Sequence, residues 1–79
     1  MYYVYILRLS DKSIYIGSAE DLKVRLINHN QGVVSSTKNF RPVELVFYSS
    51  FEDRIVALRF EKYLKTGSGF AFRKKHFGC

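Results

Sequence analysis

Residues 2–9 constrain the fold more than any other stretch, because they are apolar on both faces of the strand that they predict. The run is almost entirely aromatic, β-branched or aliphatic, as is typical of strands. Successive side chains of a strand point to opposite faces. One face then carries Tyr3, Tyr5 and Leu7, and the other carries Val4 and Ile6. Since both sets need to be covered, we expect helices on both sides of the sheet that contains this strand.

Two further strands follow in the sequence. Residues 14–17 repeat this character after the turn-type sequence of residues 10–13, which predicts a β-hairpin. Residues 43–48 predict a third strand directly after Pro42. Before it, residues 31–41 form a polar loop that is longer than most connections, and such loops are often functional.

A first helix is predicted between the hairpin and this loop. Ser18 is followed three residues later by Asp21, which has the form of a capping box. We therefore expect the helix to begin at Ser18, to run to about Asn30 and to stop at Gly32.

A second helix is expected to begin at Ser49 or Ser50 and to end before Gly67. Its buried side is predicted to consist of apolar residues at helical spacing: Val56, Ala57, Phe60, Tyr63 and Leu64. Residues 66–69 contain two glycines and predict a flexible break. Residues 70–77 are basic and indicate a short helix or a frayed end.

The charge of the chain favours a polyanionic partner. A net charge of +6 and a pI near 9.7 on 79 residues point to nucleic acid, with an anionic membrane surface as the alternative. A chain of this length is expected to form one domain, residues 1–79, with a packed core. Its apolar N-terminal run predicts a strand, not a signal peptide or a membrane span. Cys79 is the only cysteine, which excludes an internal disulfide, so we expect a cytoplasmic location.

Two basic residues share a stripe of the first predicted helix with two leucines. Arg25 and His29 are one turn apart and alternate with leucine at i, i+3, i+4 and i+7. In a purely structural interpretation, Arg25 extends past a leucine to solvent while His29 caps the helix end as a cation. In a functional interpretation, both face Tyr15 and Gly17 at the preceding strand end and bind an anion. That glycine would let another backbone or a phosphate approach closely.

Tyr5 and Tyr15 lie on neighbouring predicted strands. If the hairpin register places them on one face, they are cross-strand or diagonal neighbours within roughly 5–8 Å. Each is then either a core aromatic with its hydroxyl at the rim or a catalytic base. A phenol with a pKa of about 10 is a poor base unless positive charge lowers it. Arg25, His29 and a metal-bound water would provide that charge.

Glu61 is placed at the border of the apolar side of the second helix. It precedes Lys65 by four residues, which is the favourable spacing for a surface ion pair. The alternative is a magnesium ligand, because Mg²⁺ keeps most of its waters and needs only one or two carboxylates when phosphate oxygens complete its shell.

The order of these residues resembles the GIY-YIG nuclease family, particularly its small stand-alone bacterial members. The resemblance rests on Tyr3-Val4-Tyr5, Tyr15-Ile16-Gly17, Arg25, His29 and Glu61, and it extends over nearly the whole chain. It implies an α/β (α+β) fold with a three-stranded antiparallel sheet flanked by helices, in the order strand, strand, helix, strand, helix and a further short helix. It also implies cleavage of phosphodiester bonds in DNA with one divalent metal, Mg²⁺ or Mn²⁺, per site.

The resemblance also implies a role for each matching residue. Tyr5 and Tyr15 correspond to the two motif tyrosines, one of which activates the attacking water. Arg25 would hold the scissile phosphate, His29 would assist proton transfer, and Glu61 would be the sole protein ligand of the metal. These roles suit phosphoryl transfer, which depends on positioning and on charge stabilisation. We expect no second domain that reads sequence, so specificity would come from DNA shape or a partner protein.

Two other functions stay open at this point. The first is a non-catalytic nucleic-acid-binding module that uses basic residues on phosphates, namely Lys38, Arg41, Arg73, Lys74 and Lys75. The second is a protein-interaction adaptor that uses the aromatic residues Phe70, Phe72 and Phe77.

Overall fold

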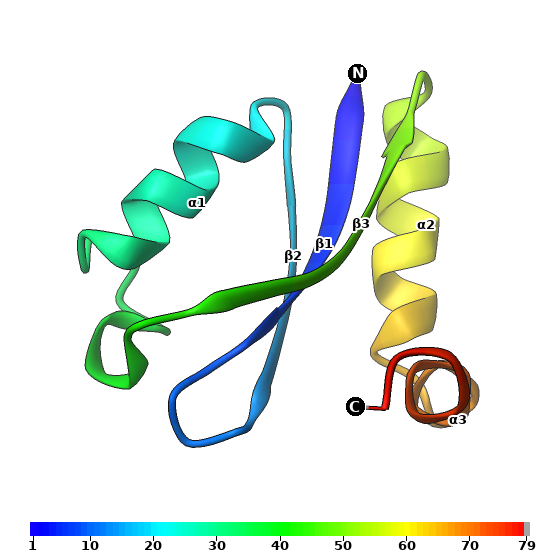
Figure 1. Ribbon diagram of the computed structural model, residues 1–79. Coiled ribbons are helices and arrows are strands. Elements are labelled where there is room, and N and C mark those ends of the chain that lie inside the picture. Colours follow the sequence, from blue (N-terminus) through cyan, green and yellow to red (C-terminus); the bar gives the residue numbers. More distant parts are fainter. Residues whose placement is uncertain (79) are drawn as a thin grey trace.

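The computed structural model describes residues 1–78 and contains one three-stranded antiparallel sheet between two layers of helix (Figure 1). The strand order is β2-β1-β3. The elements in chain order are β1 (Tyr2–Arg8), β2 (Ile14–Ala19), α1 (Leu22–Asn30), a short 3₁₀ turn (Lys38–Phe40), β3 (Glu44–Phe51), α2 (Arg54–Leu64) and α3 (Gly67–Phe77). This arrangement confirms the predicted fold class. Cys79 lies outside the described residues.

The two faces of the central strand β1 form two separate hydrophobic cores, as the alternation of its side chains predicts. Val4 and Ile6 are buried with Ala57 and Leu64 of α2. Tyr5 and Leu7 point to the other face, on the side where Figure 1 shows α1. Since each face has its own helical cover, residues on opposite faces meet only around an open edge of the sheet.

The first helix begins later than predicted. Ser18 lies within β2, opposite Val4 of β1, and the N-cap of α1 is Asp21, whose Oδ1 accepts a hydrogen bond from the backbone N–H of Val24 at 3.1 Å. Pairing with β1 extends β2 to Ala19 and satisfies the backbone around Ser18, so the next acceptor side chain becomes the cap. The end of the helix at Asn30 agrees with the prediction.

The second helix shows the same error for the same reason. Ser49 and Ser50 pair with β1 as part of β3, which extends to Phe51 instead of ending near residue 48. The N-cap of α2 is Asp53, whose side chain accepts from the N–H of Ile55 at 2.8 Å. A serine can act as a helix cap, but strand pairing satisfies its backbone instead.

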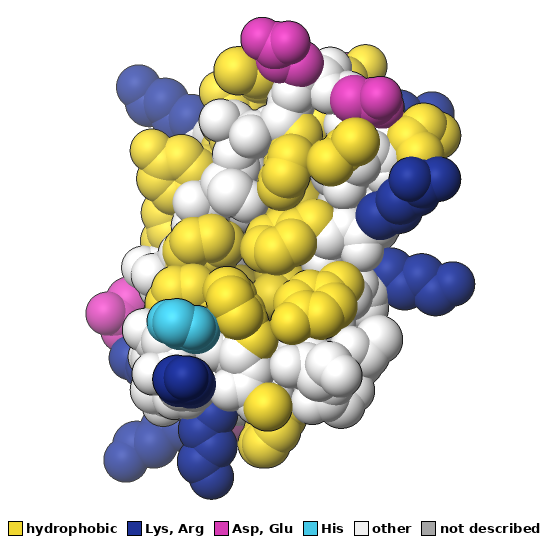
Figure 2. Space-filling view, turned by 90° about the vertical axis from the view of Figure 1, so that its right-hand side faces the viewer, with side chains coloured by type: hydrophobic (Ala, Val, Ile, Leu, Met, Phe, Trp, Pro, Cys, Tyr) yellow, Lys and Arg dark blue, Asp and Glu magenta, His cyan; other side chains and the backbone are white. Residues whose placement is uncertain are grey.

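Only part of the predicted buried side of α2 is buried. Ala57 and Leu64 are inaccessible, whereas Val56 is 44% exposed and Tyr63 is 40% exposed. Figure 2 shows hydrophobic side chains gathered on the side of the molecule where α2 lies, with lysine and arginine side chains around them. The helix therefore contacts the sheet through a narrower stripe than its sequence suggests.

Residues 66–69 are not a flexible break. Thr66 is the N-cap of α3, and its Oγ1 accepts a hydrogen bond from the N–H of Gly69 at 3.2 Å. Gly69 is buried, and a Cβ at this position would collide with the carbonyl oxygen of Tyr63 and the backbone of Leu64. The glycine thus lets α3 start directly against the end of α2. In α3, Phe72 and Phe77 pack partly against the core and Phe70 is 52% exposed; the adaptor hypothesis expected all three to be exposed.

We expect Gly69→Ala to destabilise the fold by about 1–3 kcal/mol, the usual cost of overpacking a close contact. Gly67→Ala is the matched control, because a Cβ at Gly67 meets nothing within 4 Å and alanine is favoured over glycine inside a helix by roughly 0.5–1 kcal/mol. Urea unfolding of both variants tests this, and equal stabilities for the two would contradict the packing role of Gly69.

Candidate active site

Four of the five predicted site residues meet on the α1 side of the sheet. Tyr5 on β1 pairs with Gly17 of β2, and the neighbouring pair joins Leu7 to Tyr15, so the two phenols are diagonal neighbours with ring centroids 6.3 Å apart. His29 of α1 lies against both rings, with centroids 5.8 Å from Tyr5 and 5.0 Å from Tyr15. The expected cross-strand proximity of the tyrosines is confirmed.

A chain of hydrogen bonds runs through the buried hydroxyl of Tyr5. The Nε–H of Arg25 donates to Tyr5 Oη at 3.4 Å, and Tyr5 Oη lies 2.9 Å from His29 Nε2. On the other side of the imidazole, Nδ1 lies 2.8 Å from Thr37 Oγ1. Both partners are hydroxyls, which donate as well as accept, so two arrangements suit a neutral His29: Tyr5 donates to Nε2 while Nδ1–H donates to Thr37, or Thr37 donates to Nδ1 while Nε2–H donates to Tyr5. In both arrangements Thr37 and Tyr5 hold the imidazole ring in place from opposite sides.

Thr37 is the site residue that sequence reasoning missed. Its side chain is fully buried, like that of His29, although it lies in the polar loop and follows two serines. A turn holds it there, because the N–H of Thr37 donates to the carbonyl of Val34 at 3.1 Å. The unusual length of this loop was the only sequence signal of a function.

The sequence predicted a cationic His29 and a phenol whose pKa is lowered by nearby positive charge. Burial shifts the pKa values of Tyr5 and His29 in the opposite directions. Desolvation raises the pKa of Tyr5, and the hydrogen bond from Arg25 opposes the rise only in part. Burial, and then the charge of Arg25, lower the pKa of His29. His29 is therefore neutral at pH 7 and neither caps α1 as a cation nor supplies positive charge to the phenols. Arg25 supplies that charge.

The buried neutral histidine predicts a loss of stability in acid. Below about pH 6.5, the ordinary pKa of the imidazole, the unfolded chain binds a proton that the folded protein resists, so the free energy of unfolding falls as the pH falls from 7 to 5.5. Urea unfolding at several pH values measures this slope. His29→Gln should flatten it, and His76→Gln, which removes an exposed histidine, should keep it. An unchanged slope in His29→Gln would contradict the assignment.

Gly17 makes room for the phenol of Tyr5. A Cβ at this position would lie 2.6 Å from Tyr5 Oη and 2.9 Å from Cε1 of Tyr15, which is closer than real Cβ atoms come. The sequence predicted close approach at this glycine, but the approaching group is a tyrosine side chain and not another backbone or a phosphate. The glycine is thus part of the geometry that positions both phenols.

Glu61 reaches the same corner from the opposite layer. It lies on α2, its side chain is 18% exposed, and its carboxylate accepts an ion-pair hydrogen bond from Lys65 Nζ at 2.8 Å. This confirms the predicted ion pair. Its partner Lys65 lines a cavity together with Tyr15 of β2, and the negative charge of Glu61 contributes to the raised pKa of Tyr5. Of the two interpretations of Glu61, the structure contains the surface ion pair, and the role of metal ligand stays a prediction.

A divalent metal fits this corner as a one-carboxylate site. Within residues 1–78 no three His, Cys, Asp or Glu side chains are grouped to bind a metal among themselves. A hydrated Mg²⁺ suits such a position, because it takes one or two carboxylates and fills its remaining positions with waters and substrate phosphate oxygens. A metal at Glu61 would compete with Lys65 for the carboxylate.

The five basic residues expected to contact phosphates do not form one surface. Arg41 stabilises the loop in which it lies. Its Nε–H donates to the carbonyl of Lys38 at 2.8 Å, and its guanidinium packs on Gly32. Arg73 Nε donates to the carbonyl of Leu64 at 3.2 Å. The 3₁₀ turn and α3 lie on opposite sides of the sheet (Figure 1), so the residues of the loop and those of α3, which include the exposed Lys74 and Lys75, are separated.

Comparison with known proteins shows the family of the chain. The model of the GIY-YIG catalytic domain matches residues 1–75, and the chain belongs to the GIY-YIG family, a family of nucleases. Among its relatives are UPF0213 proteins. One from Staphylococcus saprophyticus is 41% identical over 68 residues, covering 85% of this chain and 83% of the relative. One from Staphylococcus epidermidis is 41% identical over 66 residues, covering 82% and 80%.

A solved structure is also similar. The solution NMR structure of a UPF0213 protein from Bacillus halodurans matches with a TM-score of 0.61 and 29% identity, covering 99% of this chain and 88% of that chain. The fold is therefore shared with this group. No helix within residues 1–78 has the length and apolar character needed to cross a bilayer.

Proposed function

We propose that the protein is an endonuclease that hydrolyses phosphodiester bonds in DNA with one divalent metal, Mg²⁺ or Mn²⁺. The observation that carries the proposal is the convergence of Tyr5, Tyr15, Arg25 and His29 on one corner of the sheet. Glu61 of α2 pairs with Lys65, which lines a cavity with Tyr15. Membership of a nuclease family supports it. DNA is the proposed substrate in preference to RNA.

In this proposal Arg25 binds the scissile phosphate. Its pKa is raised mainly by the hydrogen bond to Tyr5, with a smaller contribution from Tyr15, so the guanidinium is charged and oriented by both phenols before substrate arrives. Charge that is fixed in place stabilises the negative charge that develops on the phosphoryl oxygens, without reorganisation during the reaction.

Tyr15 is proposed as the base. It is partly exposed, whereas Tyr5 is inaccessible and its hydroxyl is already bound by Arg25 and His29. The Tyr15 phenolate, stabilised by Arg25, takes a proton from the attacking water as the water oxygen bonds to phosphorus and the P–O bond to the leaving strand breaks. Tyr5, His29 and Thr37 position the two rings.

Glu61 would hold the metal. When bound, the divalent ion supplies positive charge that stabilises the transition state at the phosphoryl group. Glu61 fixes the side of the substrate from which this charge acts, opposite the guanidinium of Arg25 across the edge of β2.

A panel of branched, nicked, duplex and single-stranded substrates tests the proposal, with Mn²⁺ or EDTA in the buffer. We expect cleavage with Mn²⁺ that stops in EDTA and in Glu61→Ala. Glu44→Ala, prepared identically, is the control for a surface carboxylate, since Glu44 is exposed and pairs with Arg8 at 3.8 Å. Equal cleavage in EDTA, or a full rate in Glu61→Ala, would contradict the proposal.

The second candidate is a nucleic-acid-binding module without catalysis. The net charge of +6 favours it. The ion pair between Glu61 and Lys65 also favours it, because the carboxylate proposed to bind the metal already has a partner. In that case the panel would show binding that weakens log-linearly with salt and no cleavage under any metal condition.

A further inference from the structure

One stripe of α2 faces the outer edge of the sheet. Arg54, Leu58, Glu61 and Lys65 follow one another at i, i+4, i+7 and i+11, which is the spacing of a single helical face. The strand next to this face is β2, an edge strand whose outer side pairs with no other strand in the sheet. The stripe and the edge strand thus form the two walls of a groove.

Cavities mark both ends of this groove. The first, of about 350 Å³, lies between Ser18 of β2 and the side chains of Arg54 and Leu58. The second, of about 420 Å³, lies between Tyr15 of β2 and the side chains of Lys65 and Arg73. Glu61 occupies the stretch of α2 between them. The proposed metal ligand Glu61 therefore lies between two cavities, and each cavity is lined by at least one basic side chain.

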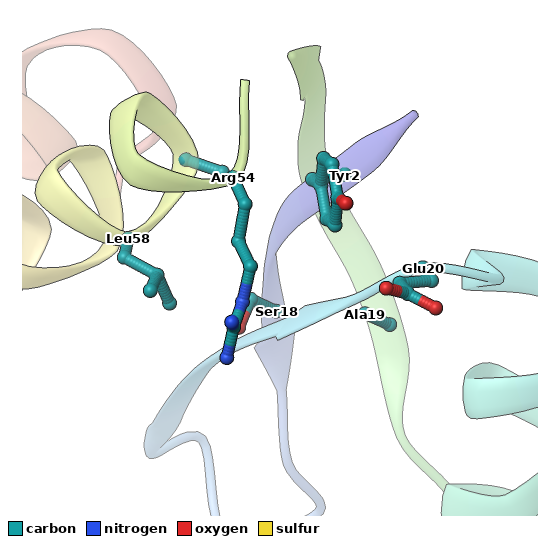
Figure 3. Close-up of a pocket in the computed structure, with 7 residues that line it drawn as sticks. Tyr2, Ser18, Ala19, Glu20, Arg54 and Leu58 are labelled. Atoms are coloured by element: carbon teal, nitrogen blue, oxygen red, sulfur yellow. The ribbon is translucent and has the colours of Figure 1, made fainter. Parts of the chain in front are cut away.

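The position of Arg54 is not explained by a stabilising interaction within residues 1–78. It is the first residue of α2, where the helix dipole disfavours a cation, and it forms no ion pair with any of residues 1–78. Figure 3 shows its side chain extended toward β2 with the guanidinium beside Ser18. Glu20 also lines this cavity, but Figure 3 shows its carboxylate well apart from the guanidinium, nearer to Ala19. A phosphate at Arg54 would thus lie away from this acid.

We propose that one strand of the nucleic acid lies in this groove, with Arg54 and Ser18 binding a phosphate on one side of the scissile linkage and Lys65 with Arg73 binding the backbone on the other side. This inference rests on the proposed function for the position of the scissile bond. The eleven residue steps from Arg54 to Lys65 span roughly 16 Å of helix. At about 3.4 Å per nucleotide, the groove accommodates about five nucleotides.

Binding to short labelled DNA, single-stranded and duplex, tests the path by fluorescence anisotropy in EDTA, where no metal-dependent cleavage occurs. Arg54→Gln should weaken binding about tenfold at 0.1 M salt and reduce the slope of log affinity against log salt by about 0.7–0.9. Arg54→Lys should retain most of the slope because it keeps the charge. Arg59→Gln is the matched control: Arg59 is an exposed arginine on the same helix that lines neither cavity, and its loss should have a clearly smaller effect.

The outcomes separate this inference from the proposed function. If the wild type binds and cleaves DNA but Arg54→Gln and Arg59→Gln behave alike, the path is wrong and the nuclease assignment is unaffected. If Arg54→Gln shows the selective loss but no metal condition gives cleavage, the path holds and the nuclease assignment fails. If the wild type binds neither form of DNA, the path is wrong.

Discussion

Arg25→Ala is expected to lower the single-turnover rate of DNA cleavage by about 10³-fold, the effect seen when a fixed donor or arginine is removed from a developing negative charge. Among residues 1–78 the guanidinium is the only positive charge that lies against the Tyr5 hydroxyl, because His29 is neutral. Its removal would therefore take away both the phosphate contact and the charge that stabilises a phenolate.

The controls for Arg25 separate charge from geometry. Arg25→Lys keeps the charge but not the planar guanidinium that donates through Nε, and we expect it to recover only part of the rate. Lys23→Ala removes an exposed cation from the same helix and should leave the rate nearly unchanged. If Arg25→Ala were as active as Lys23→Ala under single-turnover conditions, Arg25 would not bind the reacting phosphate.

Gly17→Ala is expected to lower the cleavage rate by about 10²-fold, because displacement of a catalytic group by about 1 Å costs that much. The new Cβ would lie 2.6 Å from Tyr5 Oη, and the Tyr5 ring is fully buried and cannot move freely. Its displacement would break the hydrogen bonds to His29 and Arg25. We also expect a loss of about 1–3 kcal/mol in stability from overpacking.

The imidazole of His29 reports this displacement without any assay of activity. The two ring nitrogens of His29 should give distinct ¹⁵N signals in the wild type, since a neutral imidazole carries a proton on only one of them, and Gly17→Ala should shift the signal of Nε2, which contacts Tyr5. Gly67→Ala introduces the same methyl group into open space and should change neither the signals nor the rate. Unchanged His29 signals in Gly17→Ala would mean that Gly17 does not position Tyr5.

The sheet was predictable because its signal is strong and local. The apolar character of both faces of β1 requires two helical layers, and the structure places one layer on each face. The helix starts were not predictable from the same local rules. Ser18, Ser49 and Ser50 are all good cap residues, but each pairs with β1, and strand pairing depends on residues distant in the sequence.

Some features of the candidate site could likewise be predicted from the sequence, and others could not. The proximity of Tyr5 and Tyr15 could be predicted from the strand pairing, and the structure confirms it. Helical spacing placed Glu61 at the border of the apolar side of α2, where it pairs with Lys65. The neutral state of His29 could not be predicted, because it depends on burial by a loop. Thr37 could not be predicted either, since nothing in its sequence neighbourhood distinguishes it from the two serines before it.

Paramagnetic Mn²⁺ tests the central claim, a one-carboxylate metal site where α2 meets the edge of β2. In ¹⁵N-labelled protein, added Mn²⁺ broadens the amide signals nearest to the bound ion. We predict broadening centred jointly on Gly17 of β2 and Glu61 of α2, and its loss in Glu61→Gln. Broadening centred on the exposed carboxylates of Asp11 or Glu52, or unchanged in Glu61→Gln, would contradict the account.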